Sequence, residues 1–324
     1  METYSLTDDM RHLSRLGLGG CPFGGHGWGP VDDRDSIHAI RRAYELGVNF
    51  FDTADVYGFG HSEHILRKAL GPQRHSVHIA TKFGVRWDAR GRTWKDASPN
   101  YLRQALDASL SRLEVECIDL YYLHWYDLKT PIEKTLEALE ELRRQGKIRA
   151  IGLSNVTAEQ LRTAASIAPI ATVQIQYSLV DQEKFERLAP VARQLGIRLT
   201  TWGSLAQGLL SGKYDGRPKF DTGDRRLHYD NFLGEKLRHN LLLVQELKNT
   251  ASQLGKTPAQ VALRWLLDTR SVGFALFGAK NIKQVEENLG ALGWRLPCEA
   301  YQRLMQLGCT ASGCQSHDPT RKTA

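Results

Sequence analysis

The stretch Phe50-Phe51-Asp52-Thr53-Ala54-Asp55-Val56-Tyr57-Gly58 passes from a short apolar run to an aspartate and then, five residues later, to a tyrosine. The apolar run predicts a buried strand, which places Asp52 and Tyr57 at or just past its carboxyl end. Two later runs end in a similar way, with Lys82 after His78-Ile79-Ala80-Thr81 and with His124 after Leu120-Tyr121-Tyr122-Leu123. In a parallel barrel the carboxyl ends of the strands form one face, and the active site lies there. We therefore expect these four side chains to meet.

Strand-like and helix-like segments alternate along the chain with short turns between them, as in a parallel sheet built from βα units. Eight strands are predicted, at Arg15–Gly19, Val48–Asp52, Val77–Lys82, Cys117–His124, Ile148–Ser154, Thr172–Tyr177, Arg198–Trp202 and Val272–Phe277. Helices are predicted between them, at Asp33–Leu46, Ser62–Leu70, Pro99–Leu113, Pro131–Arg144, Ala158–Ala168, Lys184–Leu195, Pro258–Leu267 and Ile282–Leu289. Eight pairs favour an α/β fold of the (β/α)8 TIM barrel type over an open doubly wound sheet.

Two segments fall outside this alternation. A short N-terminal hairpin is predicted before the barrel, from Thr3–Leu6 and Arg11–Ser14. A long loop, residues 203–236, follows the seventh strand and precedes a helix that begins near Leu237. Loops of this length in a compact domain are usually functional lids or mobile segments. We expect residues 1–308 to form a single barrel domain with a C-terminal helical extension, and residues 309–324 to form a flexible tail.

Composition limits the classes of protein to which the chain can belong. Its 324 residues are 41% hydrophobic and 24% charged, which is ordinary for a soluble globular protein. No run approaches the roughly 18 apolar residues needed to span a bilayer, and the first residues do not resemble a signal peptide. We therefore expect a cytoplasmic location and no membrane partner. Five cysteines without a C-x-x-C pair indicate reduced thiols.

Charge and histidine spacing argue against two further functions. The net charge is +7, but no Lys/Arg run is longer than two residues, so a nucleic-acid partner is not expected. A phosphorylated small ligand accounts for the charge equally well. His61 and His64 are three residues apart, as are His75 and His78, but no H-E-x-x-H motif occurs and no metal site is expected.

The four converging side chains suit the reduction of a carbonyl group, which needs a hydride donor and an acid that protonates the oxygen. A tyrosine has an ordinary pKa of about 10 and is a poor acid at neutral pH. We expect the Lys82 ammonium to lower the pKa of Tyr57 and Asp52 to fix that lysine. His124 can orient the substrate oxygen by a hydrogen bond.

The chain resembles the aldo-keto reductase family from about Arg15 to about Arg303. The resemblance rests on Gly47–Ala54 with Tyr57-Gly58, on Ala80-Thr81-Lys82, on Asp119-Leu120-Tyr121 leading to His124, and on Gly146–Asn155. By this resemblance Asp52, Tyr57, Lys82 and His124 match the catalytic tetrad, with Tyr57 as the general acid.

The resemblance also implies the cofactor NADP(H), bound at the barrel mouth without a Rossmann motif. Positions expected at the nicotinamide and its ribose are Asp52, Ser154, Asn155, Gln176 and Trp202, the last as a stacked ring. The pyrophosphate is expected at the backbone of Leu205 and Gly208 and at the Lys213 ammonium. The adenosine end is expected at Gly278, Lys280, Gln284, Glu287 and Asn288, with Lys280 at the 2′-phosphate near a helix N-terminus.

Aromatic residues after several strands predict an apolar substrate pocket, with Trp28, Trp87 and Trp125 as its walls together with Phe23. The basic residues Arg217, Lys219, Arg225 and Arg226 lie in the long loop. Three interpretations remain open for these side chains: solvation, closure over the cofactor phosphates, or contact with an anionic substrate.

The leading hypothesis is an NADPH-dependent reductase that converts an aldehyde or ketone to an alcohol, with a small-molecule carbonyl compound as its partner. The alternative is a regulatory NADP(H)-binding subunit that senses redox state and turns over very slowly, since related barrels can serve in this way. The sequence does not predict the natural substrate, the physiological direction, the preference for NADPH over NADH, or the oligomeric state.

Overall fold

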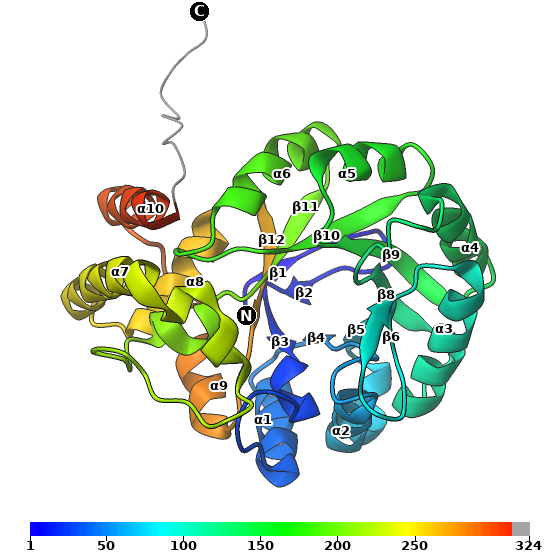
Figure 1. Ribbon diagram of the computed structural model, residues 1–324, viewed down its shortest axis with the longest axis horizontal. Coiled ribbons are helices and arrows are strands. Elements are labelled where there is room, and N and C mark those ends of the chain that lie inside the picture. Colours follow the sequence, from blue (N-terminus) through cyan, green and yellow to red (C-terminus); the bar gives the residue numbers. More distant parts are fainter. Residues whose placement is uncertain (313–324) are drawn as a thin grey trace, which may run out of the picture.

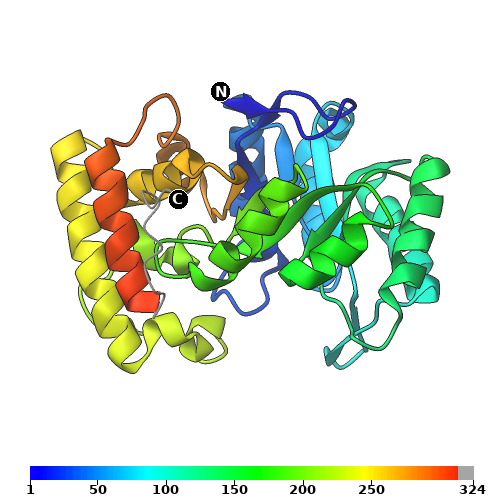
Figure 2. The same ribbon diagram turned by 90° about the horizontal axis from the view of Figure 1, so that it is seen from above.

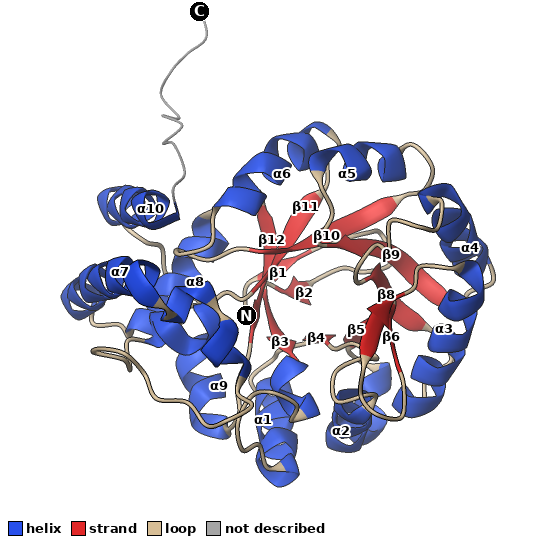
Figure 3. Cartoon of the chain, viewed as in Figure 1, coloured by secondary structure: helices blue, strands red, loops and turns tan. Residues whose placement is uncertain are grey.

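The computed structural model describes residues 1–312. Eight parallel strands close into a barrel (Figure 3), which confirms the predicted (β/α)8 fold. In chain order these strands are β3 (Leu16–Gly19), β4 (Phe50–Asp52), β5 (His78–Phe83), β8 (Ile118–Leu123), β9 (Ile148–Ser154), β10 (Ile170–Gln176), β11 (Arg198–Trp202) and β12 (Val272–Phe277). The barrel closes where β12 pairs with β3, with Ala275 opposite Leu16 and Phe277 opposite Leu18.

Helices surround the barrel on the outside (Figure 1). They are α1 (Asp33–Glu45), α2 (His61–Leu70), α3 (Pro99–Leu113), α4 (Ile132–Arg144), α5 (Ala158–Ala165), α6 (Glu183–Gln194), α7 (Gly234–Leu254), α8 (Pro258–Asp268), α9 (Ile282–Leu289) and α10 (Cys298–Ser312). Local sequence explains several of their starts. Ser98 caps α3 by accepting from the Tyr101 amide, and Thr257 and Gln260 form a capping box at α8.

The amino-terminal end of the barrel is covered by the hairpin of β1 (Thr3–Tyr4) and β2 (Leu13–Ser14). Met10 and Leu13 from this hairpin are fully buried and belong to the same apolar cluster as Phe50 and Phe274 inside the barrel. Because this end is filled with side chains, a ligand can enter the barrel only from the carboxyl ends of the strands.

Three features are added to the eight strand–helix units of the barrel. A second hairpin, β6 (Val85–Trp87) with β7 (Thr93–Lys95), follows β5 at the carboxyl face. The long loop 203–236 contains the short 3-10 turns η3 (Ala206–Ser211), η4 (Arg225–His228) and η5 (Asp230–Phe232). Helices α7 and α10 pack side by side outside the ring of helices (Figure 2).

The structure describes only the first part of the C-terminal segment. Helix α10 continues to Ser312, so its last turn occupies the first residues of the segment expected to form a tail. The remainder of that segment, 313–324, lies outside the described residues. Within residues 1–312 no helix combines the length and apolar character that crossing a bilayer requires.

Candidate active site

Four elements bring the expected tetrad together at the carboxyl face of the barrel. Asp52 ends β4, Lys82 lies in β5, His124 directly follows β8, and Tyr57 lies in the turns that lead from β4 to α2. The Lys82 Nζ lies 5.1 Å from the centre of the Tyr57 ring. The Tyr57 and His124 rings meet edge to face with their centres 5.8 Å apart. The structure therefore places the four side chains in one cluster.

Lys82 is a buried cation held by two oxygens. Its Nζ donates to Asp52 Oδ1 over 2.6 Å and to the Thr53 carbonyl over 2.7 Å, and its side chain is 0% exposed. Asp52 Oδ2 accepts from Gln174 Nε2 over 2.7 Å. Because both charges are removed from water, each needs the other to remain ionised. The pair therefore fixes the ammonium beside the Tyr57 ring.

His124 is held as a neutral imidazole. Burial and the nearby Lys82 ammonium lower its pKa well below the ordinary value. Its Nδ1 is buried and has no hydrogen-bond partner among residues 1–312. A neutral imidazole carries one N–H, so it can hydrogen-bond an oxygen in the cavity without bringing a second positive charge.

The Tyr57 hydroxyl does not have the lowered pKa expected from its lysine neighbour. Burial raises the pKa of Tyr57 well above the ordinary value, and the nearby Cys21 and Asp52 raise it further. Arg225 acts in the opposite direction. The physical reason is that burial removes the phenolate from water, and this cost exceeds the stabilisation that the Lys82 ammonium, already paired with Asp52, can give. Tyr57 is therefore a neutral phenol that still holds its proton.

Asn155, directly after β9, links the carboxyl end of the adjacent β8 to that of β11. Its backbone has φ +56°, in the left-handed region that non-glycine residues rarely adopt. Its Nδ2 donates to the His124 carbonyl and to Ser154 Oγ, while its Oδ1 accepts from Trp202 Nε1 over 3.3 Å. This strained residue ties the histidine strand to the Trp202 ring, so the catalytic and expected nicotinamide positions are fixed together.

A cavity of about 880 Å³ opens over this cluster, near the upper end of the usual range for small-molecule sites. It is lined by Asp52, Tyr57 and His124 and by most of the positions expected at the cofactor. These are Ser154, Asn155, Trp202, Leu205, Gly208, Lys213, Gly278, Lys280, Gln284, Glu287 and Asn288. One continuous cavity thus runs from the catalytic phenol to the start of α9.

The far part of this cavity suits an anion. Burial and the charges of Arg226 and Lys213 lower the pKa of Lys280, while Asp224 acts against them. Three cations therefore gather around one carboxylate, and that carboxylate already pairs with Arg226 at 2.6 Å. The uncompensated positive charge fits the phosphates of a dinucleotide.

Comparison with known proteins places this geometry in a family. The model of the aldo/keto reductase family matches residues 15–308. The chain belongs to the aldo-keto reductase family. It is therefore an oxidoreductase, and the enzymes of this family use a nicotinamide cofactor.

Individual relatives align with this reductase over most of their length. It is 38% identical over 302 residues to the aldo-keto reductase YhdN of Bacillus subtilis, covering 92% of this chain and 91% of that protein. It is 36% identical over 277 residues to a Schizosaccharomyces pombe aldo-keto reductase whose name includes NADP(+), covering 83% and 81%. The solved glycerol dehydrogenase of Gluconobacter oxydans superposes with a TM-score of 0.86 at 35% identity, covering 96% of each chain.

For four residues of this reductase, the location or contact in the structure differs from the one expected from the sequence. Gln176 does not line the cavity, whereas Gln174, two residues earlier on the same face of β10, does. Trp87 also lies outside the lining and packs on Phe59, which does line it, with ring centres 5.9 Å apart. Phe23 is 1% exposed and belongs to the hydrophobic core.

The fourth difference concerns the backbone of the loop after β11. The Gly208 amide, expected to donate to a phosphate, donates instead to the Leu205 carbonyl over 2.9 Å. Gly208 has φ +92° and lies beside the Lys213 ammonium, 3.3 Å from where a Cβ would be. A side chain at this position would therefore be strained and would crowd the lysine.

Sequence reasoning missed several residues that line the cavity: Cys21, His26, Phe59, Gln174 and Tyr229. Cys21 Sγ accepts from the indole N–H of Trp28, which fixes that wall of the cavity. The alternation of Gln174, Ile175 and Gln176 signals an inward-facing pair, but it does not say which glutamine lies deeper. The other positions come from loops, where sequence spacing does not predict direction. Among residues 1–312 no group of His, Cys, Asp and Glu side chains is arranged to hold a metal ion.

Proposed function

We propose that this reductase converts an aldehyde or ketone to an alcohol with NADP(H) as hydride donor and with Tyr57 as proton donor. The observation that carries the proposal is the position of the Tyr57 hydroxyl, whose ring lines the cavity beside the His124 ring and the Lys82 ammonium. A group that still holds its proton at neutral pH suits the direction of reduction, because that direction consumes a proton.

Each residue has a separate task in this proposal. His124 orients the carbonyl oxygen toward the Tyr57 hydroxyl, and Tyr57 delivers its proton as negative charge develops on that oxygen. The resulting phenolate is stabilised by the adjacent Lys82 ammonium, whose position Asp52 holds. A bound nicotinamide supplies the hydride.

The cofactor would be held by residues of this chain along the whole cavity. The side-chain amides of Asn155 and Gln174 and the Trp202 ring suit the nicotinamide end, and Lys213 and Lys280 suit the phosphates. The choice of NADP(H) rests on the cations around Lys280 and on the S. pombe relative whose name includes NADP(+).

Substitution of Tyr57 by phenylalanine tests the proposal. Tyr57→Phe removes the donated proton and leaves the ring, so we expect NADPH affinity to be retained and carbonyl reduction to fall by about 10²- to 10⁴-fold. Tyr44→Phe, at an exposed position on α1, is the matched control and should leave both unchanged. NADPH binding is measured by tryptophan fluorescence and reduction by NADPH absorbance with a panel of aldehydes, ketones and quinones.

Two outcomes would contradict the proposal. Full reductase activity in Tyr57→Phe would remove the tyrosine from the mechanism. If the wild-type protein bound NADPH but oxidised it with no carbonyl compound under single-turnover conditions, the regulatory alternative would be favoured instead.

A further inference from the structure

Two consecutive arginines in the long loop have different surroundings. The side chain of Arg226 is 14% exposed and donates to both oxygens of Asp224, at 2.9 and 2.6 Å. It also donates to the Tyr214 hydroxyl over 3.1 Å and lies over the Phe220 ring. Arg226 is thus neutralised and anchors the loop.

Arg225 instead packs against Gly27, which lies between β3 and α1. Its amide donates to the Gly27 carbonyl over 3.0 Å. Its side chain lies so close to Gly27 that an added Cβ would come within 2.6 Å of Arg225 Cγ and 2.8 Å of Nε. Gly27 therefore leaves room for the arginine stem, and Arg225 lines the same cavity as Tyr57.

The Arg225 guanidinium has no carboxylate partner among residues 1–312. Two acids near the cavity already have cationic partners, since Asp52 pairs with Lys82 and Asp224 pairs with Arg226. The guanidinium is a solvent-exposed cation beside aromatic walls, and no carboxylate of the described residues pairs with it.

The charge of Arg225 acts at the catalytic end of the cavity rather than at the phosphate end. Burial raises the pKa values of Tyr57, Cys21 and Tyr229, and Arg225 opposes that rise at all three. The cations that act on Lys280 are Arg226 and Lys213. The two arginines thus serve different ends of one cavity.

We propose that Arg225 binds an anionic group of the substrate, so that the preferred substrates are aldehydes or ketones that also carry a carboxylate or a phosphate. This inference rests on the proposed function of the site. A guanidinium offers two parallel N–H groups to an oxyanion, and the aromatic walls formed by Trp28 and Tyr229 cover the rest of a small molecule.

Matched pairs of carbonyl compounds test the proposal at saturating NADPH. Wild-type kcat/KM should be higher for 4-oxobutanoate than for butanal, and higher for D-glyceraldehyde 3-phosphate than for D-glyceraldehyde if phosphate is the preferred anion. Arg225→Met should lower kcat/KM for the anionic member by about 10- to 100-fold, mostly through KM. In the same variant NADPH affinity should stay within about twofold, and kcat/KM for butanal should fall much less than kcat/KM for the anionic member. Arg225→Lys should retain part of the preference.

Controls separate this effect from a general change in charge. Arg217→Met removes an exposed arginine of the same loop that does not line the cavity, and it should leave all values unchanged. The KM for the anionic member should rise with ionic strength in the wild-type protein, because salt screens an exposed charge.

Three outcomes would overturn the proposal. One is equal wild-type efficiency toward neutral and anionic carbonyls. The second is an equal loss for both in Arg225→Met, and the third is weaker NADPH binding in that variant, which would assign the guanidinium to the cofactor.

A binding measurement separates this inference from the proposed function. Succinate should bind to the NADP(+)-loaded protein in calorimetry and lose affinity in Arg225→Met. Such binding without turnover of any carbonyl would count against the proposed reduction while supporting the anion site.

Discussion

Lys82 and Asp52 combine a structural role and a chemical role in one ion pair. Both side chains are almost fully buried, at 0% and 3% exposure. Lys82→Met should lower the free energy of unfolding by about 3–5 kcal/mol, because it leaves the Asp52 carboxylate buried without a cation. The double variant Lys82→Met/Asp52→Asn should recover most of this loss. Chemical denaturation of the wild-type protein and both variants measures it.

Reductase activity separates the two roles. If the ammonium stabilises the Tyr57 phenolate, both variants should have low kcat although the double variant is stable. A stable double variant with wild-type kcat would mean that Lys82 acts only in folding.

Asp55 is a buried carboxyl that the proposed mechanism does not use. Burial raises its pKa well above the ordinary value, and the neighbouring Glu63 raises it further. The number of protons available for hydrogen bonds also indicates that Asp55 is protonated. The Tyr101 hydroxyl lies 3.1 Å from the Val85 carbonyl and 3.3 Å from Asp55 Oδ2, but it has one proton to donate. Both contacts are satisfied if a neutral Asp55 donates to Tyr101 and Tyr101 donates to Val85.

This protonation makes stability depend on pH in a defined direction. The unfolded carboxyl loses its proton near pH 4, whereas the folded one keeps it to higher pH. The contribution of Asp55 to stability is therefore complete below about pH 4 and declines as pH rises toward the folded pKa. Asn cannot titrate, so the stability of Asp55→Asn relative to wild type should increase between pH 5 and pH 8. Urea unfolding at both pH values measures this difference, and a constant difference would mean that Asp55 is ionised.

Sequence reasoning at the residue scale succeeded where a side chain follows a buried strand. Asp52, Lys82 and His124 each occupy such a position, and the structure brings them together with Tyr57. Trp87 and Gln176 do not line the cavity, because the distance of a side chain from a cavity depends on the neighbouring loops and on depth in the barrel. Their contacts with substrate and cofactor stay predictions. The raised pKa of Tyr57 could not be predicted either, since it depends mainly on how completely the folded chain buries the hydroxyl.

At the scale of elements, the start of α9 joins the phosphate end of the cavity to the loop that carries Trp28. The Lys280 Nζ donates to the Trp28 carbonyl, and its amide donates to Gln284 Oε1. If Lys280 contacts a 2′-phosphate, Lys280→Met should weaken NADPH binding by about 10- to 100-fold and leave NADH binding unchanged. Lys283→Met, exposed on the same helix, is the control. Equal losses for the two cofactors in a fluorescence titration would contradict the assignment.

The elements that could be predicted are those with strong local signals. All eight barrel strands overlap the ranges predicted for them, and α3 and α8 each begin at a capping Ser or Thr followed by proline, at Ser98 and Thr257. The hairpin of β6 and β7 was not predicted, because each of its strands has only three residues and β7 is fully exposed. Such strands lack the alternation that buried faces impose.

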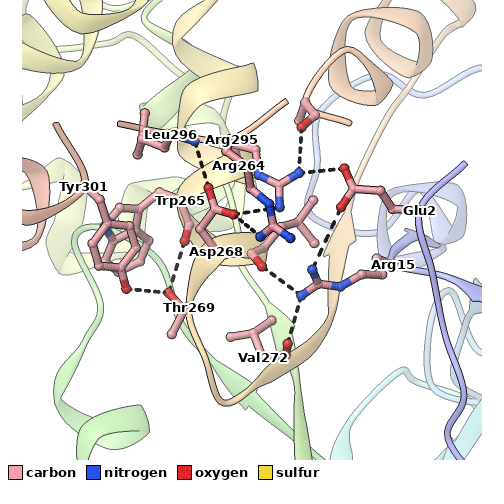
Figure 4. A network of polar contacts seen from close by, with 12 residues as sticks. Glu2, Arg15, Arg264, Trp265, Asp268, Thr269, Val272, Arg295, Leu296 and Tyr301 are labelled. Atoms are coloured by element: carbon pink, nitrogen blue, oxygen red, sulfur yellow. Dashed lines mark hydrogen bonds and ion pairs between the residues drawn. The ribbon is translucent and has the colours of Figure 1, made fainter. Parts of the chain in front are cut away.

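At the scale of the whole molecule, a polar network joins Glu2 to α8, to the start of β12 and to the segment before α10 (Figure 4). Arg264 of α8 is 0% exposed and donates to Glu2 near the N-terminus over 2.8 Å and to Asp268 over 3.0 Å. Asp268 also accepts from Arg295 and from the Leu296 amide, just before α10. Arg15 donates to the Leu267 carbonyl in α8 and to the Val272 carbonyl at the start of β12. The network thus closes the barrel at the end opposite to the cavity.

Asp268 is the acceptor that Arg264, Arg295 and Leu296 share, so its removal tests how much this network contributes to stability. Asp268→Ala leaves the buried Arg264 with Glu2 as its remaining carboxylate and leaves the Leu296 amide without its acceptor. We expect a loss of about 3–5 kcal/mol in the free energy of unfolding. Glu235→Ala breaks an exposed pair with Arg238 and should change it by less than about 1 kcal/mol. Because the network lies at the amino-terminal end of the strands, NADPH affinity and kcat of folded Asp268→Ala should match the wild type. A loss of cofactor affinity without a loss of stability would show that the two ends of the barrel are coupled.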